Sequence, residues 1–268
     1  MDQNKDQFSQ FKATQREGWA LFAPLEAITT PPAAKIVKFA KVNSAEKVLD
    51  VGCGTGVVAV TAALKGAKVS ALDLSPVLLE KAYENAKIAG VEIDFTEGDV
   101  EYLPYKDATF DVVMSQFGHM FAPRPEVAIS EMLRVLKPGG TIVFSTWPPE
   151  MYTGQMFSLI GKYLPPPEGV APPPLWGEPT IIRQRLGNHV KDIFFDRQVM
   201  QKPCLSLKHA RVQFELTAGP MVTLAKKLSK ENPSLLEDFR SQFEKHISKY
   251  LKGNILRMHY LMTRATKN

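Results

Sequence analysis

The sequence predicts an α/β fold in which a mostly parallel sheet of seven strands carries helices on both faces. Residues 45–146 alternate short β-branched runs with amphipathic helical segments, which is typical of βαβ units. Two further strand-like segments follow near the C-terminus. The 268 residues include 44% hydrophobic and 23% charged residues. This ordinary globular composition suits one such domain with additions.

The seven expected strands are short runs of apolar and β-branched residues bounded by turn residues. Five lie before residue 150. The two C-terminal strands are expected to join the edge of the sheet, one of them antiparallel. The strands are expected at residues 47–51, 68–72, 92–96, 110–115, 141–146, 193–199 and 255–264.

Helix signals lie between these strands. Ser75 and Pro76 begin a helix, with proline at the first helical position, and Gly90 ends it. Residues 126–136 predict a second amphipathic helix, which the Lys-Pro-Gly-Gly sequence at 137–140 stops. Further helices are expected near residues 179–187 and, as two Lys-rich helices, between residues 207 and 250.

Two segments flank the predicted core. Residues 8–42 look helical in pieces, broken by Pro24 and by the pair Pro31-Pro32. Residues 164–179 carry seven prolines, which favours a linker or an irregular cover over a site. We therefore expect a single domain with an N-terminal helical cap (1–44), a core (45–150) and a cap that completes the sheet (151–268).

Several classes of protein do not fit the composition. No apolar run approaches the roughly 18 residues of a membrane-spanning helix, and the N-terminal MDQNKDQFSQFK lacks the apolar region of a secretory signal. Two cysteines are too few for a disulfide scaffold, and the four histidines after residue 150 show no ligand spacing. We expect a cytoplasmic protein without a metal site.

Charge is distributed unevenly along the chain. The net charge of +5 combines an acidic first part, residues 1–150, with a basic second part, residues 151–268. The basic part fits either a set of solvated Lys-rich helices or contact with an anionic partner, and peripheral membrane contact stays open. Because no RNA-binding module is visible, no nucleic-acid partner is expected. The oligomeric state is not indicated.

The most specific feature is the sequence VLDVGCGTG at residues 48–56. A buried strand leads into glycines at positions 52, 54 and 56, and a helix follows. Glycine is needed where the chain turns abruptly and where backbone touches a ligand. The loop therefore predicts a ligand lying across the carboxyl ends of parallel strands.

Two types of ligand fit such a loop. A dinucleotide site has the spacing G-x-G-x-x-G, whereas this loop has G-x-G-x-G, and Asp50 precedes it. A carboxylate beside a diphosphate is unfavourable, but it suits a ligand that carries an ammonium group. Asp73 follows the second strand, where a carboxylate that binds the ribose hydroxyls fits both ligands. Asp99 follows the third strand, where a carboxylate suits an adenine amino group.

At this point the sequence resembles the class I methyltransferases that use S-adenosylmethionine, in particular the small-molecule group with ubiquinone- and menaquinone-type enzymes. The resemblance implies a Rossmann-like fold, S-adenosylmethionine as cofactor and S-adenosylhomocysteine as product. It rests on VLDVGCGTG (48–56), ALDLSP (71–76), EGDVEYLPY (97–105), FDVVMSQFGHMFAP (110–123) and MLRVLKPGGTIVFSTW (132–147).

The resemblance also implies roles for individual residues. Asp50 and the glycine loop would hold the methionine portion, Asp73 the ribose hydroxyls and Asp99 the adenine amino group. The segment around Trp19 would close over the cofactor. The implied cofactor-binding residues are Asp50, Gly52, Cys53, Gly54, Gly56, Asp73, Leu74, Asp99, Val100, Ser115, Phe117 and Trp19.

The acceptor side is less defined. His119 follows the fourth strand and is either a general base or a residue of the pocket wall. Large apolar side chains near it suit a small aromatic or lipid-like acceptor. The candidate substrate-binding residues are His119, Met120, Trp147, Tyr152 and Trp176.

Three other functions stay open. The basic C-terminal part permits methylation of a protein or RNA. A nicotinamide dehydrogenase would use a similar fold, although the glycine spacing and Asp99 disfavour it. A regulator that senses the cofactor without turnover would keep the same loop.

Overall fold

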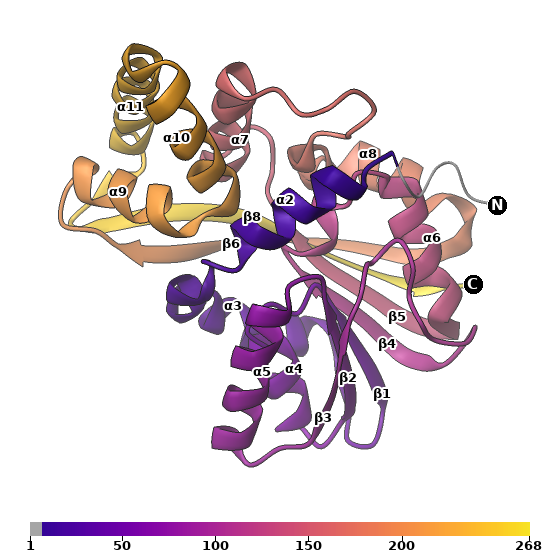
Figure 1. Cartoon of the computed structure of the whole chain (residues 1–268). Coiled ribbons are helices and arrows are strands. Elements are labelled where there is room, and N and C mark those ends of the chain that lie inside the picture. The colour runs from indigo at the N-terminus through magenta and orange to yellow at the C-terminus, as the bar shows by residue number, and fades with distance from the viewer. Residues whose placement is uncertain (1–6) are drawn as a thin grey trace.

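The computed structural model describes residues 7–268, in which one twisted sheet lies between layers of helices (Figure 1). Residues 1–6, which begin the polar N-terminal segment, lie outside the described residues. Along the sheet the strands follow the order β3 (Ile93–Glu97), β2 (Lys68–Asp73), β1 (Lys47–Val51), β4 (Phe110–Gln116), β5 (Leu136–Thr146), β8 (Ile255–Lys267) and β6 (Val190–Pro203). A short β7 (Leu251–Lys252) pairs with β8.

The sheet is parallel from β3 to β5, and β8 is antiparallel to both of its neighbours. This confirms the predicted mostly parallel sheet, completed at its edge by two C-terminal strands. The strand order reverses between β1 and β4, because the chain first moves outward through β2 and β3 and then returns to the other side of β1. Ligands of open α/β sheets bind at such a reversal.

Helices cover both faces of the sheet (Figure 1). Right-handed crossovers place the helices between β1 and β3 on one face and the helix between β4 and β5 on the other. The first face carries α3 (Glu26–Ala40), α4 (Val57–Ala63) and α5 (Pro76–Ala89), and the second carries α6 (Pro125–Val135) and α8 (Pro179–Leu186). The predicted start and end of α5 are confirmed, since Pro76 begins it and Gly90 follows it in a left-handed conformation.

The predicted break at Pro31-Pro32 is wrong. After α2 (Ser9–Trp19) and a short 3-10 turn η1 (Ala23–Leu25), α3 runs through both prolines without interruption. The two residues lie in the second turn, so only carbonyls near the start of the helix lose a partner. Beyond them, Ala33, Ile36 and Val37 are buried in the core, and this packing outweighs the low helix propensity of proline.

Four helices gather at one end of the long strands β6 and β8 (Figure 1). They are α7 (Tyr152–Tyr163), α9 (Leu207–Thr217), α10 (Gly219–Glu231) and α11 (Pro233–Ser248). We call this set the C-terminal cap. The sequence did not predict α7, and three helices instead of two lie between residues 207 and 250. The additional boundary has a local cause, because Pro220 and Pro233 each lie in the first turn of a new helix.

The predicted strands are longer in the structure than expected at the C-terminal side of the sheet. α6 ends at Val135, before the Lys-Pro-Gly-Gly sequence, and these four residues lie inside β5, which begins with Leu136 instead of at residue 141. Gly140 lies so close to the Asp111 carbonyl oxygen that an added Cβ would approach it to 2.9 Å.

No helix among residues 7–268 combines the length and apolar character needed to cross a bilayer.

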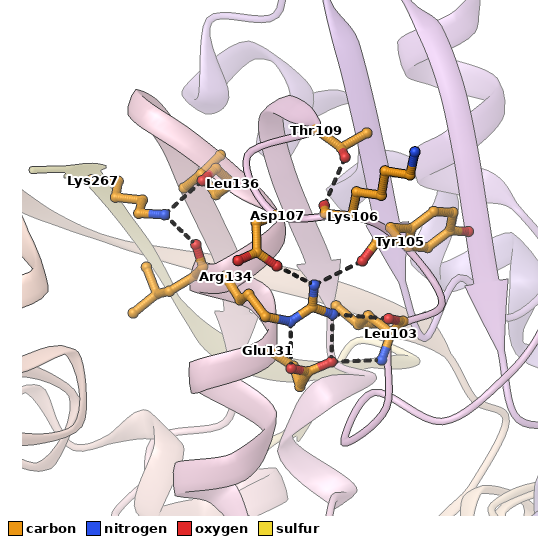
Figure 2. Close-up of polar contacts among 10 residues, drawn as sticks. Leu103, Tyr105, Lys106, Asp107, Thr109, Glu131, Arg134, Leu136 and Lys267 are labelled. Carbon is orange, nitrogen blue, oxygen red and sulfur yellow. Dashed lines mark hydrogen bonds and ion pairs between the residues drawn. The ribbon is translucent and has the colours of Figure 1, made fainter.

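One side chain on α6 fixes the loop that joins β3 to β4 (Figure 2). The Arg134 guanidinium donates to both Glu131 carboxylate oxygens, to Asp107 and to the carbonyl oxygens of Leu103 and Tyr105, at 2.7–2.9 Å. Glu131 in turn accepts the Leu103 N–H at 2.9 Å. The Arg134 guanidinium lowers the pKa of Glu131, so the pair is charged at neutral pH and the loop is held at its middle.

We expect Arg134→Met to reduce the free energy of unfolding by about 2–3 kcal/mol, because several charge-assisted hydrogen bonds are lost together. A matched control is Arg197→Met, which removes an exposed ion pair with Glu150 and should change stability by less than about 1 kcal/mol. Urea denaturation of the three proteins measures both values. Equal losses in the two variants would show that Arg134 does not anchor the loop.

Candidate active site

The loop after β1 has the backbone geometry that its glycines predict. Gly52, Gly54 and Gly56 have φ angles of +64°, +56° and +80°, a region that residues with a Cβ rarely adopt. A Cβ on Gly52 would lie 2.8 Å from the Cα of Gly118, whereas a Cβ on Gly54 would meet nothing within 4 Å. Gly52 is therefore packed against the loop after β4, and Gly54 faces open space where a ligand can approach the backbone.

Asp73 lies at the end of β2 and braces this loop. Its carboxylate accepts the Gly54 N–H at 2.7 Å and the Ser75 N–H at 2.9 Å. Burial raises its pKa, and these two N–H groups act in the opposite direction. The side chain thus connects the ends of β1 and β2 and presents a carboxylate at the carboxyl edge of the sheet.

Asp50 is a buried carboxyl group without a hydrogen-bond partner. Both oxygens are inaccessible and unpaired, although the Ala59 N–H lies close enough to favour the charged form. Burial, together with the nearby Asp73 carboxylate, raises the pKa of Asp50 to about 7. An uncompensated carboxylate in such a place is costly, so the site suits a ligand that brings positive charge.

The third predicted carboxylate, Asp99, is engaged by the N-terminal helix. Lys12 on α2 donates to Asp99 Oδ2 at 2.6 Å and to Glu101 Oε2. Asp99 Oδ1 accepts the N–H of Glu101 at 2.9 Å. Glu101, whose side chain is fully buried, also pairs with Arg124 at 2.7 Å. This network holds α2 across the carboxyl edge of the sheet.

The far end of α2 touches the C-terminal cap. Gly18 and Gly219 approach so closely that a Cβ on Gly18 would lie 3.2 Å from the Gly219 Cα. Trp19 follows and packs on Phe121, with ring centroids 4.7 Å apart. As a result α2 covers the edge of the sheet from the loop after β3 to the cap (Figure 1).

These elements enclose a cavity with about 1400 Å³ of empty volume, including its open mouth. Twelve of the residues predicted from sequence line it: Trp19, Asp50, Gly52, Cys53, Gly54, Asp73, Leu74, Asp99, Val100, Phe117, His119 and Trp147.

Five predicted residues do not line the cavity. Ser115 supports the site from behind, because its hydroxyl donates to the Val51 carbonyl at 2.6 Å and accepts the His119 N–H at 3.0 Å. The other four are buried in packing contacts: Gly56 against Ala82, Tyr152 against His246, Trp176 against His119, and Met120 within the core.

His119 is neutral in this environment. Its ring packs on Phe144 and Trp176, with centroids 4.8 Å and 4.6 Å away, and neither ring nitrogen has a hydrogen-bond partner. Burial, reinforced by the nearby Arg185 charge, lowers the pKa of His119 to about 3. A base this weak contributes little to proton removal at neutral pH, so the geometry favours the wall residue over the general base.

The end of the cavity away from the glycine loop is largely apolar. Phe117 and Trp147 stack at 4.0 Å with their rings 9° from parallel. The remaining wall comes from α7, from α9 and the turn after it, and from β6 and β8: Met156, Phe157, Phe214, Ala218, Met200 and Met258. Sequence reasoning missed these residues, because they lie in segments without a motif and resemble ordinary core positions.

Several polar residues of the cavity were also missed: Lys12, Gln15, Thr29, Thr55, Gln116 and Thr153. Lys12 and Thr153 come from helices α2 and α7, and nothing in their local sequence distinguishes them. Gln116 is the last residue of β4, between the predicted Ser115 and Phe117. Its position at the carboxyl end of a parallel strand was the available signal. Among the described residues, no group of three or more His, Cys, Asp or Glu side chains is placed to hold a metal ion.

Asp50→Asn is expected to stabilise the ligand-free protein in a pH-dependent way. The folded-state pKa of about 7 lies above the value of about 3.9 in an unfolded chain. The folded protein therefore binds the extra proton between these values, and its stability falls as the pH rises from about 4 to about 7. Asparagine removes this loss, so the variant should gain up to about 4 kcal/mol above pH 7.

Urea denaturation of both proteins without ligand, at about pH 5 and about pH 8, measures the difference. The advantage of Asp50→Asn should be larger at the higher pH. A difference that is the same at both values would show that the Asp50 carboxyl is not the titrating group.

The site fits S-adenosylmethionine, whose ammonium and sulfonium groups are both positive. The unpaired Asp50 carboxyl provides a place for positive charge, and the backbone at Gly54 is open to a ligand. Asp73 and Asp99 lie at the ends of the next two strands, as a nucleoside lying across the sheet edge requires.

Comparisons with known proteins agree with this assignment. The profile of the family described as "Methyltransferase domain" matches residues 49–144. An uncharacterised protein of Mycobacterium tuberculosis (strain ATCC 25618 / H37Rv) is 31% identical over 95% of this chain and 94% of its own length.

Two enzymes match over shorter stretches, each at 38% identity. They are a demethylmenaquinone methyltransferase of Clavibacter sepedonicus, covering 45% of this chain and 50% of the enzyme, and a malonyl-[acyl-carrier protein] O-methyltransferase of Erwinia pyrifoliae, covering 42% and 41%.

A solved structure from Bacillus halodurans C-125, assigned as a methyltransferase, superposes with a TM-score of 0.60 at 20% identity, covering 88% of this chain and 98% of that one. At this identity the superposition shows the fold, and the family follows from the sequence matches. The chain belongs to the class I methyltransferases that use S-adenosylmethionine.

Proposed function

We propose that the protein transfers the methyl group of S-adenosylmethionine to a small, aromatic or lipid-like acceptor. One observation carries the proposal: a single cavity runs from the glycine loop and its three carboxylates to an apolar wall built by the C-terminal cap. A methyl donor bound at the first end would face an acceptor at the second. The acidic end suits the charged donor, and the apolar end suits an acceptor that is poorly hydrated.

Each part of the donor end has a role for this chain's residues. The Asp50 carboxylate would face the ammonium group, and Asp73 would accept from the ribose hydroxyls while keeping its bond to Gly54. The Asp99 carboxylate, which already accepts a hydrogen bond from Lys12, would also accept one from the adenine amino group. Leu74 and the Val100 N–H lie in the same wall, where they would contact the adenine ring.

The cofactor supplies an electrophilic methyl group on a sulfonium, so the protein has little activation to provide. Its contribution is to orient the acceptor and to keep water out. Phe117 and Trp147 form a rigid stacked wall, and α2 with Trp19 closes the cavity from above. Where the acceptor must lose a proton, the buried His119 is a poor recipient because its pKa is about 3.

The donor assignment is tested by thermal denaturation with S-adenosylmethionine, S-adenosylhomocysteine and NAD in parallel. A ligand that binds only the folded state raises the midpoint, and we expect this for the first two alone. Asp73→Ala should weaken donor binding by about 1.5–3 kcal/mol. Asp73→Asn, which keeps one oxygen for the Gly54 N–H, should lose less. Stabilisation by NAD and not by the methyl donor would overturn the proposal.

The acceptor class is tested with labelled donor and fractionated cell extract. Label in the organic phase supports a lipid-like acceptor, and label in precipitated protein or RNA supports the alternative that the basic C-terminal part suggests. Donor binding without any transfer would instead indicate a regulator that senses the cofactor. The cover formed by α2 favours the small molecule, since a polymer would have to enter beneath this helix.

The role of His119 is tested without an acceptor. Because its pKa is about 3, its imidazole should keep the neutral form throughout titration from about pH 5 to about pH 9. Heteronuclear NMR of the ring nitrogens follows the protonation state, and the His119 signals are identified by their absence from the His119→Gln spectrum. A transition near neutral pH in those signals would support a general base.

A further inference from the structure

Gln116 is a polar residue of the cavity whose orientation is fixed by its neighbour. It ends β4 and lies next to Phe117, and its amide nitrogen donates to the Thr29 carbonyl oxygen on α3 at 3.0 Å. A carbonyl oxygen only accepts hydrogen bonds, so the NH₂ group of Gln116 must face Thr29. The other atom of the amide, Oε1, is therefore held in place as an acceptor.

This Oε1 atom has no partner. It is buried from solvent and makes no hydrogen bond within the described residues. A buried acceptor left unsatisfied costs about 1–3 kcal/mol, and a ligand that supplies an O–H or N–H group recovers part of this cost. Thr153 lies in the same cavity with an unpaired, buried hydroxyl. Two residues of the cavity wall thus carry a buried polar atom without a hydrogen-bond partner.

The charges around the cavity restrict what that partner is. Three of the described residues that line it are acidic: Asp50, Asp73 and Asp99. Lys12 is the one lysine or arginine among these described residues, and it is already paired with Asp99 and Glu101. His119 is uncharged at neutral pH because burial lowers its pKa to about 3. No cation in the described wall is free to neutralise a carboxylate on the acceptor, and burying an unpaired carboxylate is strongly unfavourable.

We infer that Gln116 Oε1 accepts a hydrogen bond from an O–H or N–H group of the acceptor, which makes Gln116 a specificity-determining residue for neutral molecules that carry such a donor. The inference rests on the proposed function and narrows its substrate class. Acceptors whose polar group is a carboxylate or an ether are disfavoured, because both present only lone pairs to Oε1. Specificity of this kind is strong, since the wrong ligand leaves a buried group unpaired.

The test uses three bicyclic probes of similar size: 2-naphthol, which donates a hydrogen bond, 2-methoxynaphthalene, which only accepts, and 2-naphthoate, which is negatively charged. Equilibrium dialysis measures their binding to the wild-type protein saturated with S-adenosylhomocysteine at neutral pH. We expect 2-naphthol to bind about 5- to 10-fold more tightly than 2-methoxynaphthalene, the effect of one hydrogen bond. The carboxylate should bind at least about 10-fold more weakly than 2-naphthol.

The variant Gln116→Met removes the acceptor at nearly the same volume. It should abolish the preference for 2-naphthol over 2-methoxynaphthalene and leave the affinity for S-adenosylhomocysteine within about twofold. The matched control is Gln155→Met on α7, which also removes a side-chain bond to a backbone carbonyl but lies outside the cavity. This control should keep the wild-type preference. The comparison of probes on the wild-type protein does not depend on either variant.

Four results would overturn the inference. Three concern the wild-type protein saturated with S-adenosylhomocysteine: equal binding of 2-naphthol and 2-methoxynaphthalene, tighter binding of 2-naphthoate than of 2-naphthol, or no binding of 2-naphthol. The fourth is a Gln116→Met variant that loses affinity for S-adenosylhomocysteine instead of the preference between the probes. Failure of the proposed function gives a different result from these four: S-adenosylmethionine and S-adenosylhomocysteine would not raise the midpoint of thermal denaturation.

Discussion

The direct backbone contact between Gly52 and Gly118 is the constraint on which the rest of the site depends. A Cβ on Gly118 would lie 2.6 Å from the Gly52 carbonyl oxygen and 2.8 Å from its Cα, so no other residue fits at either position without movement of the loops. The contact joins the ends of β1 and β4, where the strand order reverses. It brings the donor loop against Gln116 and Phe117, which belong to the acceptor wall. Phe117 itself has a φ angle of +63°, a strained conformation for an aromatic residue that is typical of functional sites.

The charges of the site follow from the same geometry. Parallel strands end at one edge, and β1 and β2 each place a buried carboxyl there, Asp50 and Asp73. In addition to burial, Asp73 raises the pKa of Asp50, and both carboxyls raise the pKa of the buried Cys53 thiol. The folded protein therefore holds more negative charge at this edge than it can neutralise, and a cationic ligand relieves the repulsion. Binding of such a ligand would be favoured at the expense of the stability of the ligand-free protein, a trade-off that is common at functional sites.

The donor half of the site was predictable from sequence, and the acceptor half was not. Asp50 and Asp73 lie near the carboxyl ends of β1 and β2, and Asp99 follows β3. The alternation of strand and helix in the sequence places such positions at one edge. The chamber around Met200, Phe214 and Met258 comes from segments far apart in the chain. Their burial looks like that of any core residue until the fold brings them together.

Local rules also failed where tertiary packing overrides them. Pro31 and Pro32 break helices in isolation, but α3 continues through them because its apolar side is buried in the core. Tyr152 and Trp176 are of the residue types that often line binding pockets, yet here they are buried behind the wall of the cavity. Sequence alone does not distinguish an aromatic residue that lines a cavity from one that supports it, since both are apolar and surrounded by apolar residues.

The division of the cavity has a consequence for specificity. The donor end is built mainly by loops between residues 50 and 100, whereas the acceptor end is built by the cap and by the helices before β1. Substitutions in the cap therefore change the acceptor chamber without touching Asp50, Asp73 or Asp99. Gln116 and Phe117 line the cavity, and the next residue, Gly118, ties their backbone to the glycine loop. Because Gly118 packs against Gly52, the backbone at the end of β4 is the most constrained part of this wall.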